Sequence, residues 1–333
     1  MLYPDLTPRS SPLPHLNHQH LGETFSRKPE DRRELLSKLD AALADTAADV
    51  VLLSYESFCL PPHRTAAPKL LCDLLARRGF RLEILMTVRP QASYILSQYT
   101  WRIQFLREAR PFRVAFLKDL AEHRYDYLHG LGTWARAADW RVHAVPLQDV
   151  RSTAPLAARI AAELGLAGRL MPLLTSADLA FRTNQSFGPV ATEVSRRLRR
   201  LGVTYDLLRS RAITGRIETL TQECGLDAEP FQGLDEAMLR KASRRFVEQN
   251  EGFAQRVWGE AWARRVRPEH LGPVNELAGR DLDVARATEV ERIKQVIVGE
   301  FELRPPSSLR RVWHNLSQGA PTWLRSSPLL RRI

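Results

Sequence analysis

The segment EILMTVRPQASYILSQYTWRIQ, residues 83–104, joins a strand pattern to a helix pattern. Ile84 to Val88 form a short apolar run, typical of a buried strand, and Arg89 and Pro90 follow it directly. Pro90 lies near the expected first position of a helix, where the missing N–H of proline costs nothing. The segment therefore predicts a strand that ends at an arginine and leads at once into a helix.

Other apolar runs in the first half of the chain predict further buried strands. They are DVVLLSYE (49–56) and WRVHAVPL (140–147), which flank RLEILMTV (81–88) in the chain. Strands separated by helices of this length favour a parallel sheet covered by helices, which is an α/β fold. The helical patterns of this half cover residues 30–43, 66–78, 91–109 and 112–138.

The second half of the chain has no comparable strand pattern. From residue 304 the composition, with RPPSSLRR and SSPLLRRI, predicts a loosely attached tail. We therefore expect an α/β core over residues 1–150, a helical region over 151–303 packed on that core, and a tail over 304–333. The helical patterns of the second region cover residues 154–166, 189–202, 235–259 and 287–301.

The composition is that of a globular protein. The chain has 333 residues, of which 44% are hydrophobic, enough for a substantial core. It contains no run of about eighteen apolar residues, and its N-terminus lacks the order of a signal peptide, so we expect no transmembrane segment and a cytoplasmic location. Its three cysteines, Cys59, Cys72 and Cys224, are too scattered for a disulfide framework or a Cys-x-x-Cys metal site.

The charge predicts attraction to polyanions. The formal net charge is +11 and the pI is about 10.0, which suits nucleic acid, acidic polysaccharide, phosphorylated nucleotides or anionic lipid. Because the Arg-Arg pairs are spread over the whole chain, solvated helix faces are favoured over a nucleic-acid groove. A nucleic-acid-binding protein remains an alternative, and it rests on this charge and on Trp101, Trp134, Trp140, Trp258 and Trp262 as stacking residues.

The junction at Arg89 has the residue types of an anion site. In an open parallel sheet, ligands bind beyond the carboxyl ends of the strands, where helix N-termini present free amides. Ser93 and Ser97 are four positions apart and share one helix face. A guanidinium can clasp a phosphate while serine hydroxyls reach its remaining oxygens. The alternatives are an ion-pair or capping role for Arg89 and simple exposure for the serines.

The order VRPQASYILSQY (88–99) resembles the 3′-phosphate-binding segment of sulfotransferases that use 3′-phosphoadenosine 5′-phosphosulfate, PAPS. Between about residue 2 and about residue 260, other stretches are similar to the bacterial carbohydrate-type branch of that family. The resemblance implies a P-loop-like core and transfer of a sulfuryl group from PAPS to a hydroxyl or amine of a carbohydrate-type acceptor, without a metal. The similar stretches are LYPD, NHQHL, VVLLSYESF, YDYL, RTNQSFGPVATEVSRRL and FVEQNEGFAQRVWG.

The resemblance also implies roles for single residues near the donor. Arg89 and Ser97, with Ser93, would hold the 3′-phosphate. Glu56, just past a predicted strand, would take the proton of the acceptor; its alternative is a helix cap or a salt bridge. Arg102 would touch the donor or the acceptor, and its alternative is an exposed helix residue.

Further polar residues are candidates for the acceptor side. His18 and His20 lie in a loop and are rival bases to Glu56; with His15 their spacing is also compatible with a metal, but no neighbouring carboxylate or cysteine supports one. Arg182, Asn184 and Ser186 in RTNQSF would line the cleft. For Asn184 and Ser186 a helix N-cap is the alternative.

One part of the family's pattern is missing from this sequence. Relatives begin with a strand and a glycine-rich loop, carrying lysine and Ser/Thr, that wraps the 5′-phosphosulfate. HLGETFSRK (20–28) and HGLGTWAR (129–136) contain Gly and Thr but follow no apolar strand, so both are predicted to be turns. Two interpretations stay open: a truncated, inactive form of a working enzyme that lacks its first strand, or a catalytically inactive protein that binds a nucleotide or a glycan.

Overall fold

The computed structural model describes residues 1–6, 18, 21, 29–55, 58, 67–180, 187–202, 207–269, 271–278 and 284–303. They belong to two compact units, each built from three stretches of the chain. The sequence predicts a division at residue 150 into a nucleotide-binding core and an acceptor-side region; these are functional regions, and the division stays a prediction. The predicted tail 304–333 lies outside the described residues. Unit 1 comprises Met1–Gln91, Glu122–Phe181 and Ser243–Pro268; unit 2 comprises Ala92–Ala121, Arg182–Ala242 and Glu269–Ile333.

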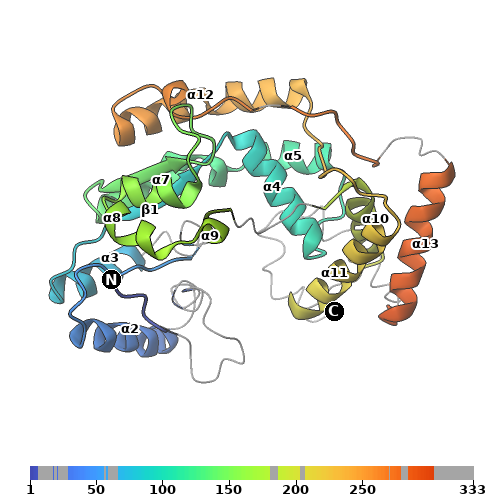
Figure 1. Cartoon of the computed structure of the whole chain (residues 1–333). Coiled ribbons are helices and arrows are strands. Elements are labelled where there is room, and N and C mark those ends of the chain that lie inside the picture. The colour runs from blue at the N-terminus through green and yellow to red at the C-terminus, as the bar shows by residue number, and fades with distance from the viewer. Residues whose placement is uncertain are drawn as a thin grey trace, which may run out of the picture. The chain divides into compact units, whose positions relative to one another are not determined.

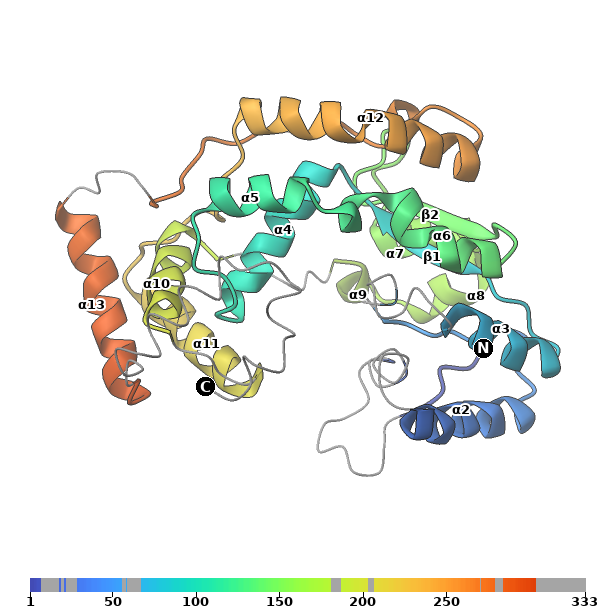
Figure 2. The same ribbon diagram turned by 180° about the vertical axis from the view of Figure 1, so that it is seen from behind.

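Unit 1 contains a parallel pair of strands. β1 (Ile84–Val88) pairs in parallel with β2 (Val142–Pro146), and Val88 lies opposite Pro146. α7 (Leu156–Glu163) covers one face of this pair and α6 (Tyr127–Ala137) covers the other (Figures 1 and 2). This arrangement confirms the predicted layering of helices on parallel strands.

The helices of unit 1 pack against this sheet and against one another. α3 (Ala67–Arg77) packs against α6, and α7 packs against both β2 and α8 (Ala167–Leu170). The longest helix of the described residues, α12 (Glu236–Trp258), has its last sixteen residues in this unit. The remaining elements are α2 (Pro29–Ala44), α9 (Ser176–Ala180), and the short 3-10 helices η3 (His123–Tyr125), η4 (Met171–Leu173) and η5 (Trp262–Arg264).

The predicted strand over residues 49–56 is wrong for its described part. Val51 forms one isolated parallel bridge with Leu2 instead of a regular ladder. The next pairing position is taken by His18, whose main-chain N–H donates to the carbonyl of Ser54 at 2.8 Å while its ring accepts from the N–H of Ser54 at 2.9 Å. Because two short segments share the edge of this stretch, no continuous strand forms.

Three other predictions need correction within the first half. The expected helix over 112–138 divides into α5 (Phe112–Leu120), η3 and α6, because Asp126 accepts from the N–H of His129 at 3.1 Å and starts a new helix. Consequently the segment 129–136, predicted to be a turn, lies inside α6. β1 is also less buried than expected: Val88 is fully buried, but Thr87 is exposed.

Unit 2 is helical in its described residues. α10 (Pro189–Arg200) packs against α11 (Leu207–Glu223) and α13 (Val284–Glu300). The unit also contains α4 (Gln91–Gln104), apart from its first residue, and α5. α11 was not among the predicted helices. The core of this unit includes the buried residues Ile95, Tyr99, Phe112, Phe116, Leu198, Ile213, Val290, Ile293 and Ile297.

The fold class is therefore α/β and mainly helical, and the described residues contain a sheet of two strands. A larger P-loop-like core stays a prediction. In the part of the chain that the structure describes, no helix has the length and apolar character needed to span a membrane.

Candidate functional site

Arg89 is the first residue beyond the carboxyl end of β1. The parallel ladder reaches Val88, whose carbonyl oxygen accepts from the N–H of Leu147 at 2.7 Å. α4 then begins at Gln91, so only Arg89 and Pro90 separate strand from helix. This strand-to-helix junction is the one that residues 83–104 predict.

Tyr127 holds the main chain of Arg89. Its hydroxyl accepts from the N–H of Arg89 at 3.1 Å and donates to the carbonyl oxygen of the same residue at 2.7 Å. Tyr127 is the first residue of α6 and only 8% exposed. One hydroxyl therefore satisfies both main-chain polar groups of the residue that leaves the strand.

An aromatic cluster of unit 1 supports the ring of Tyr127. The ring stacks on Trp262, with centroids 6.0 Å apart, and lies 5.6 Å from Phe253, which is fully buried. Trp258 contacts both of these rings, and its indole N–H donates to the carbonyl oxygen of Ala144 in β2 at 3.0 Å. The cluster thus connects α6 and α12 to the sheet.

The first residue of α4 is held by a reciprocal amide pair. Gln91 donates to Asn250 at 2.5 Å and accepts from it at 2.9 Å. Gln91 is 3% exposed, so the half-buried amide of Asn250 supplies the partner that the burial of Gln91 requires. Asn250 lies in α12, and the same helix contacts Tyr127 through Phe253. α12 therefore supports both the first residue of α4 and the tyrosine that holds Arg89.

Ser93 and Ser97 lie on α4 in unit 2, whereas Arg89 belongs to unit 1. Both serines are half-buried. The main-chain N–H of Ser93 donates to a carboxylate oxygen of Glu269 at 3.0 Å, and the carbonyl oxygen of Ser97 accepts from the hydroxyl of Thr100 at 3.0 Å. The convergence of Arg89 and Ser97 on one phosphate stays a prediction.

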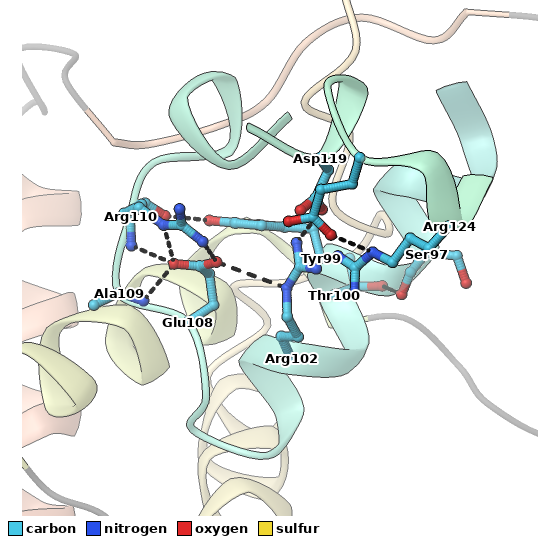
Figure 3. A network of polar contacts seen from close by, with 10 residues as sticks. Ser97, Tyr99, Thr100, Arg102, Glu108, Ala109, Arg110, Asp119 and Arg124 are labelled. Atoms are coloured by element: carbon cyan, nitrogen blue, oxygen red, sulfur yellow. Dashed lines mark hydrogen bonds and ion pairs between the residues drawn. The ribbon is translucent and has the colours of Figure 1, made fainter. Parts of the chain in front are cut away.

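Arg102 is part of a buried ionic network in unit 2, not an exposed helix residue (Figure 3). Its guanidinium lies 2.5 Å from the carboxylate of Asp119 and 3.6 Å from that of Glu108, and both carboxylates are almost fully buried. Arg110 also pairs with Glu108, at 2.5 Å. These ion pairs favour a structural role for Arg102.

The same network fixes the protonation of its buried groups. Burial alone would raise the pKa of Glu108, but hydrogen bonds from the side chain and main chain of Arg110, with the charges of Arg110 and Arg102, leave that pKa below its ordinary value. Tyr99 donates its hydroxyl to the carbonyl oxygen of Arg110 at 3.0 Å, and burial raises the pKa of Tyr99 (Figure 3). Glu108 is therefore an anion, and Tyr99 a neutral donor, at neutral pH.

His18 is buried, and both of its ring nitrogens contact the main chain. Nδ1 accepts from the N–H of Ser54, so Nε2 carries the proton and donates to the carbonyl oxygen of Pro4 at 3.0 Å. The ring also lies against Tyr3 in an edge-to-face contact. This arrangement favours a structural role, in which His18 joins the N-terminal residues to the stretch that ends at Tyr55.

The remaining predicted site residues, Glu56, His20, Arg182, Asn184 and Ser186, lie outside the described residues. Within the described part of the chain, no group of three or more His, Cys, Asp or Glu residues is arranged to hold a metal ion.

The tryptophans that suggested nucleic-acid stacking are mostly engaged within their own units. Trp134 is 6% exposed, and its indole N–H donates to the carbonyl oxygen of Phe58 at 2.7 Å. Trp258 and Trp262 belong to the aromatic cluster. Trp101, at 39% exposed, has the guanidinium of Arg107 over its ring. These contacts favour core and core-edge packing over a stacking platform.

Several of these residues carried no functional interpretation in the sequence. Asp126 is a typical N-cap residue, and recognising it would have placed Tyr127 at the start of a helix. The pairing of Gln91 with Asn250 and that of Ser93 with Glu269 join residues more than 150 positions apart, for which the sequence has no local signal.

Comparisons of the chain with known protein families, with curated proteins and with solved structures give no match.

Proposed function

We propose that this protein is a sulfotransferase that moves a sulfuryl group from PAPS to a hydroxyl or amine of a carbohydrate-type acceptor. The observation that carries the proposal is the position of Arg89, one residue beyond a parallel strand and directly before a helix, with its main chain held by Tyr127. Ligands of open parallel sheets bind at such junctions. The resemblance of residues 88–99 to the family's 3′-phosphate segment names the ligand.

The proposed donor contacts are charge-assisted. Arg89 would make a two-pronged contact to the 3′-phosphate, and the hydroxyls of Ser97 and Ser93 would reach its other oxygens. A guanidinium suits this role because it stays charged at any physiological pH and presents its donors in a planar fork. Each hydrogen bond to a charged group is worth about 1.5–3 kcal/mol.

The proposed reaction is a direct in-line displacement. The acceptor oxygen or nitrogen forms a bond to sulfur while the bond between sulfur and the bridging oxygen of the 5′-phosphate breaks. Adenosine 3′,5′-bisphosphate leaves with that bonding pair, and the acceptor's proton passes to the carboxylate of Glu56. Nothing is oxidised or reduced in this step, and it requires no metal.

The acceptor contacts are proposed for the polar residues that the sequence assigns to the cleft. They are His20, Arg182, Asn184 and Ser186. His18 is better suited to the scaffold, because both of its ring nitrogens are bonded to main-chain groups. Arg102 likewise has two carboxylate partners within its own unit.

Calorimetric titration with adenosine 3′,5′-bisphosphate tests the donor site. We expect the native chain to bind and Arg89→Ala to bind about 10- to 150-fold more weakly, which corresponds to one lost charge-assisted contact. Arg81→Ala is the matched control, because Arg81 precedes β1 and is exposed in a pair with Glu83. Failure of the native chain to bind, or unchanged affinity in Arg89→Ala, would overturn the proposal.

Transfer is measured separately, with PAPS labelled in its sulfate and a panel of unsulfated glycans. Label that appears on a glycan supports the enzyme. Binding of the bisphosphate without any transfer would replace the enzyme by its alternative, a sulfotransferase-like module that binds a nucleotide or glycan without chemistry.

A further inference from the structure

We infer that Tyr127 is the positioning residue of the proposed donor site, because its hydroxyl sets the main-chain direction from which the Arg89 side chain reaches the 3′-phosphate. The inference rests on the proposed function and adds to it the residue through which the arginine is held. In this role the hydroxyl of Tyr127 bonds to the main chain of Arg89, and Tyr127 is not proposed to contact the donor.

The hydroxyl of Tyr127 pairs with the first main-chain groups beyond the parallel ladder. The carbonyl oxygen of Val88 is paired with the N–H of Leu147 in the parallel ladder at 2.7 Å. At the next residue, Arg89, the N–H and the carbonyl oxygen both bond to the hydroxyl of Tyr127, at 3.1 and 2.7 Å. The main chain is therefore held in place for one residue beyond the strand, and that residue is Arg89, the proposed phosphate-binding residue.

The residue after Arg89 restricts it further. Pro90 disfavours helical main-chain angles at the preceding residue and pushes it toward an extended conformation. With the ladder before it, a proline after it and one hydroxyl across it, Arg89 has little main-chain freedom left. The direction of its Cα–Cβ bond is thereby set before any ligand arrives.

The hydroxyl can act in this way only because the ring that carries it is itself held. Tyr127 begins α6, whose start is capped by Asp126. Its ring stacks on Trp262 and contacts Phe253 of α12. The same cluster reaches β2 through the hydrogen bond between Trp258 and Ala144. The position of the hydroxyl is thus fixed relative to β2.

This rigidity has a consequence for binding. A long arginine side chain loses rotamer freedom when it clasps a phosphate, and a main chain that also had to become ordered would add to that cost. A preset main chain removes the second cost. Loss of the hydroxyl should therefore weaken phosphate binding without removing any group that contacts the phosphate.

Tyr127→Phe is the direct test, since it deletes the hydroxyl and keeps the ring in the cluster. We expect it to bind adenosine 3′,5′-bisphosphate about 5- to 30-fold more weakly than the native chain, the order expected when the main chain of one residue must become ordered on binding. Thr214→Val is the matched control: it also deletes one buried hydroxyl, which donates to the carbonyl oxygen of Ser210 in unit 2 at 3.0 Å. We expect its affinity to be unchanged.

A double-mutant cycle separates positioning from a general loss of stability. If Tyr127 acts through Arg89, then Tyr127→Phe weakens binding in the native chain but adds nothing in the Arg89→Ala background. An equal loss in both backgrounds, or no loss in a folded Tyr127→Phe protein, would overturn the inference. If Tyr127→Phe does not fold, Trp262→Leu replaces it in the cycle. Trp262→Leu keeps the hydroxyl of Tyr127 but removes the ring that stacks on the ring of Tyr127.

The two proposals fail in different ways. If the native chain does not bind the bisphosphate, or if Arg89→Ala binds it equally well, the proposed function fails. If Arg89→Ala weakens binding and Tyr127→Phe does not, the function stands and only the positioning role is lost.

Discussion

The carboxylate of Glu269 accepts a hydrogen bond from the main-chain N–H of Ser93 at 3.0 Å, across 176 positions of sequence. Ser93 lies in the first turn of α4, where main-chain N–H groups have no partner inside the helix. Further along the same segment, Glu276 accepts from the N–H of Phe112, the first residue of α5, at 2.6 Å. Glu269 and Glu276 thus each place a negative charge at the start of a helix, the end that favours anions.

Removal of this charge should destabilise the start of α4. We expect Glu269→Ala to lower the free energy of unfolding by about 0.5–2 kcal/mol, the range for loss of a capping side chain, and Glu269→Gln to cost less because its amide oxygen can still accept. Urea unfolding measures the cost, and faster hydrogen exchange of the Ser93 amide would locate it. Glu229→Ala, at an exposed position outside the helices of unit 2, is the control. Equal costs for the two alanine variants would contradict the capping role.

The network around Glu108 should make stability depend on pH in the acid range. The pKa of Glu108 is below its ordinary value in the folded protein. Its ionisation therefore stabilises the fold above the unfolded-state pKa, about 4.3, and this contribution is lost as the pH falls through the lower, folded pKa.

We expect the free energy of unfolding to decrease as the pH falls below about 4.3. The decrease should be smaller in Glu108→Gln, because the glutamine side chain does not titrate. Urea unfolding at a series of pH values from neutral to acid measures this. Glu229→Gln, at an exposed position, should follow the native curve. If Glu108→Gln also followed it, the network would not be the source of the pH dependence.

The amide pair of Gln91 and Asn250 should behave as a coupled unit. Asn250→Leu leaves the buried amide of Gln91 without its partner and should cost about 1–3 kcal/mol. Gln91→Leu should cost less, because the amide of Asn250 is only half-buried. The double variant removes both polar groups, so its cost should be well below the sum of the two. The free energies of unfolding of the four proteins complete the cycle, and additive costs would show that the two amides do not depend on each other. Gln222→Leu, on the exposed surface of α11, should have little effect.

The local pattern of residues was enough to predict the elements that carry the candidate site. The apolar run before Arg89 predicted β1, and Pro90 with the helical spacing from Gln91 predicted α4, because both signals involve residues close to one another in the chain. β2 followed in the same way from its apolar run. The split between α5 and α6 was also signalled locally, by Asp126 as an N-cap, but the continuous helical pattern around it concealed the break.

Only the tertiary structure shows which distant side chains hold these elements in place. The hydroxyl of Tyr127 reaches Arg89 across 38 positions, and the carboxylate of Glu269 reaches Ser93 across 176. The stretch after Asp49 is not a regular strand because Leu2 and His18 share its edge. Periodicity reports which face of an element is apolar, but a hydrogen bond from a distant side chain has no period. Such a bond exists only once packing has brought its donor and acceptor within about 3 Å.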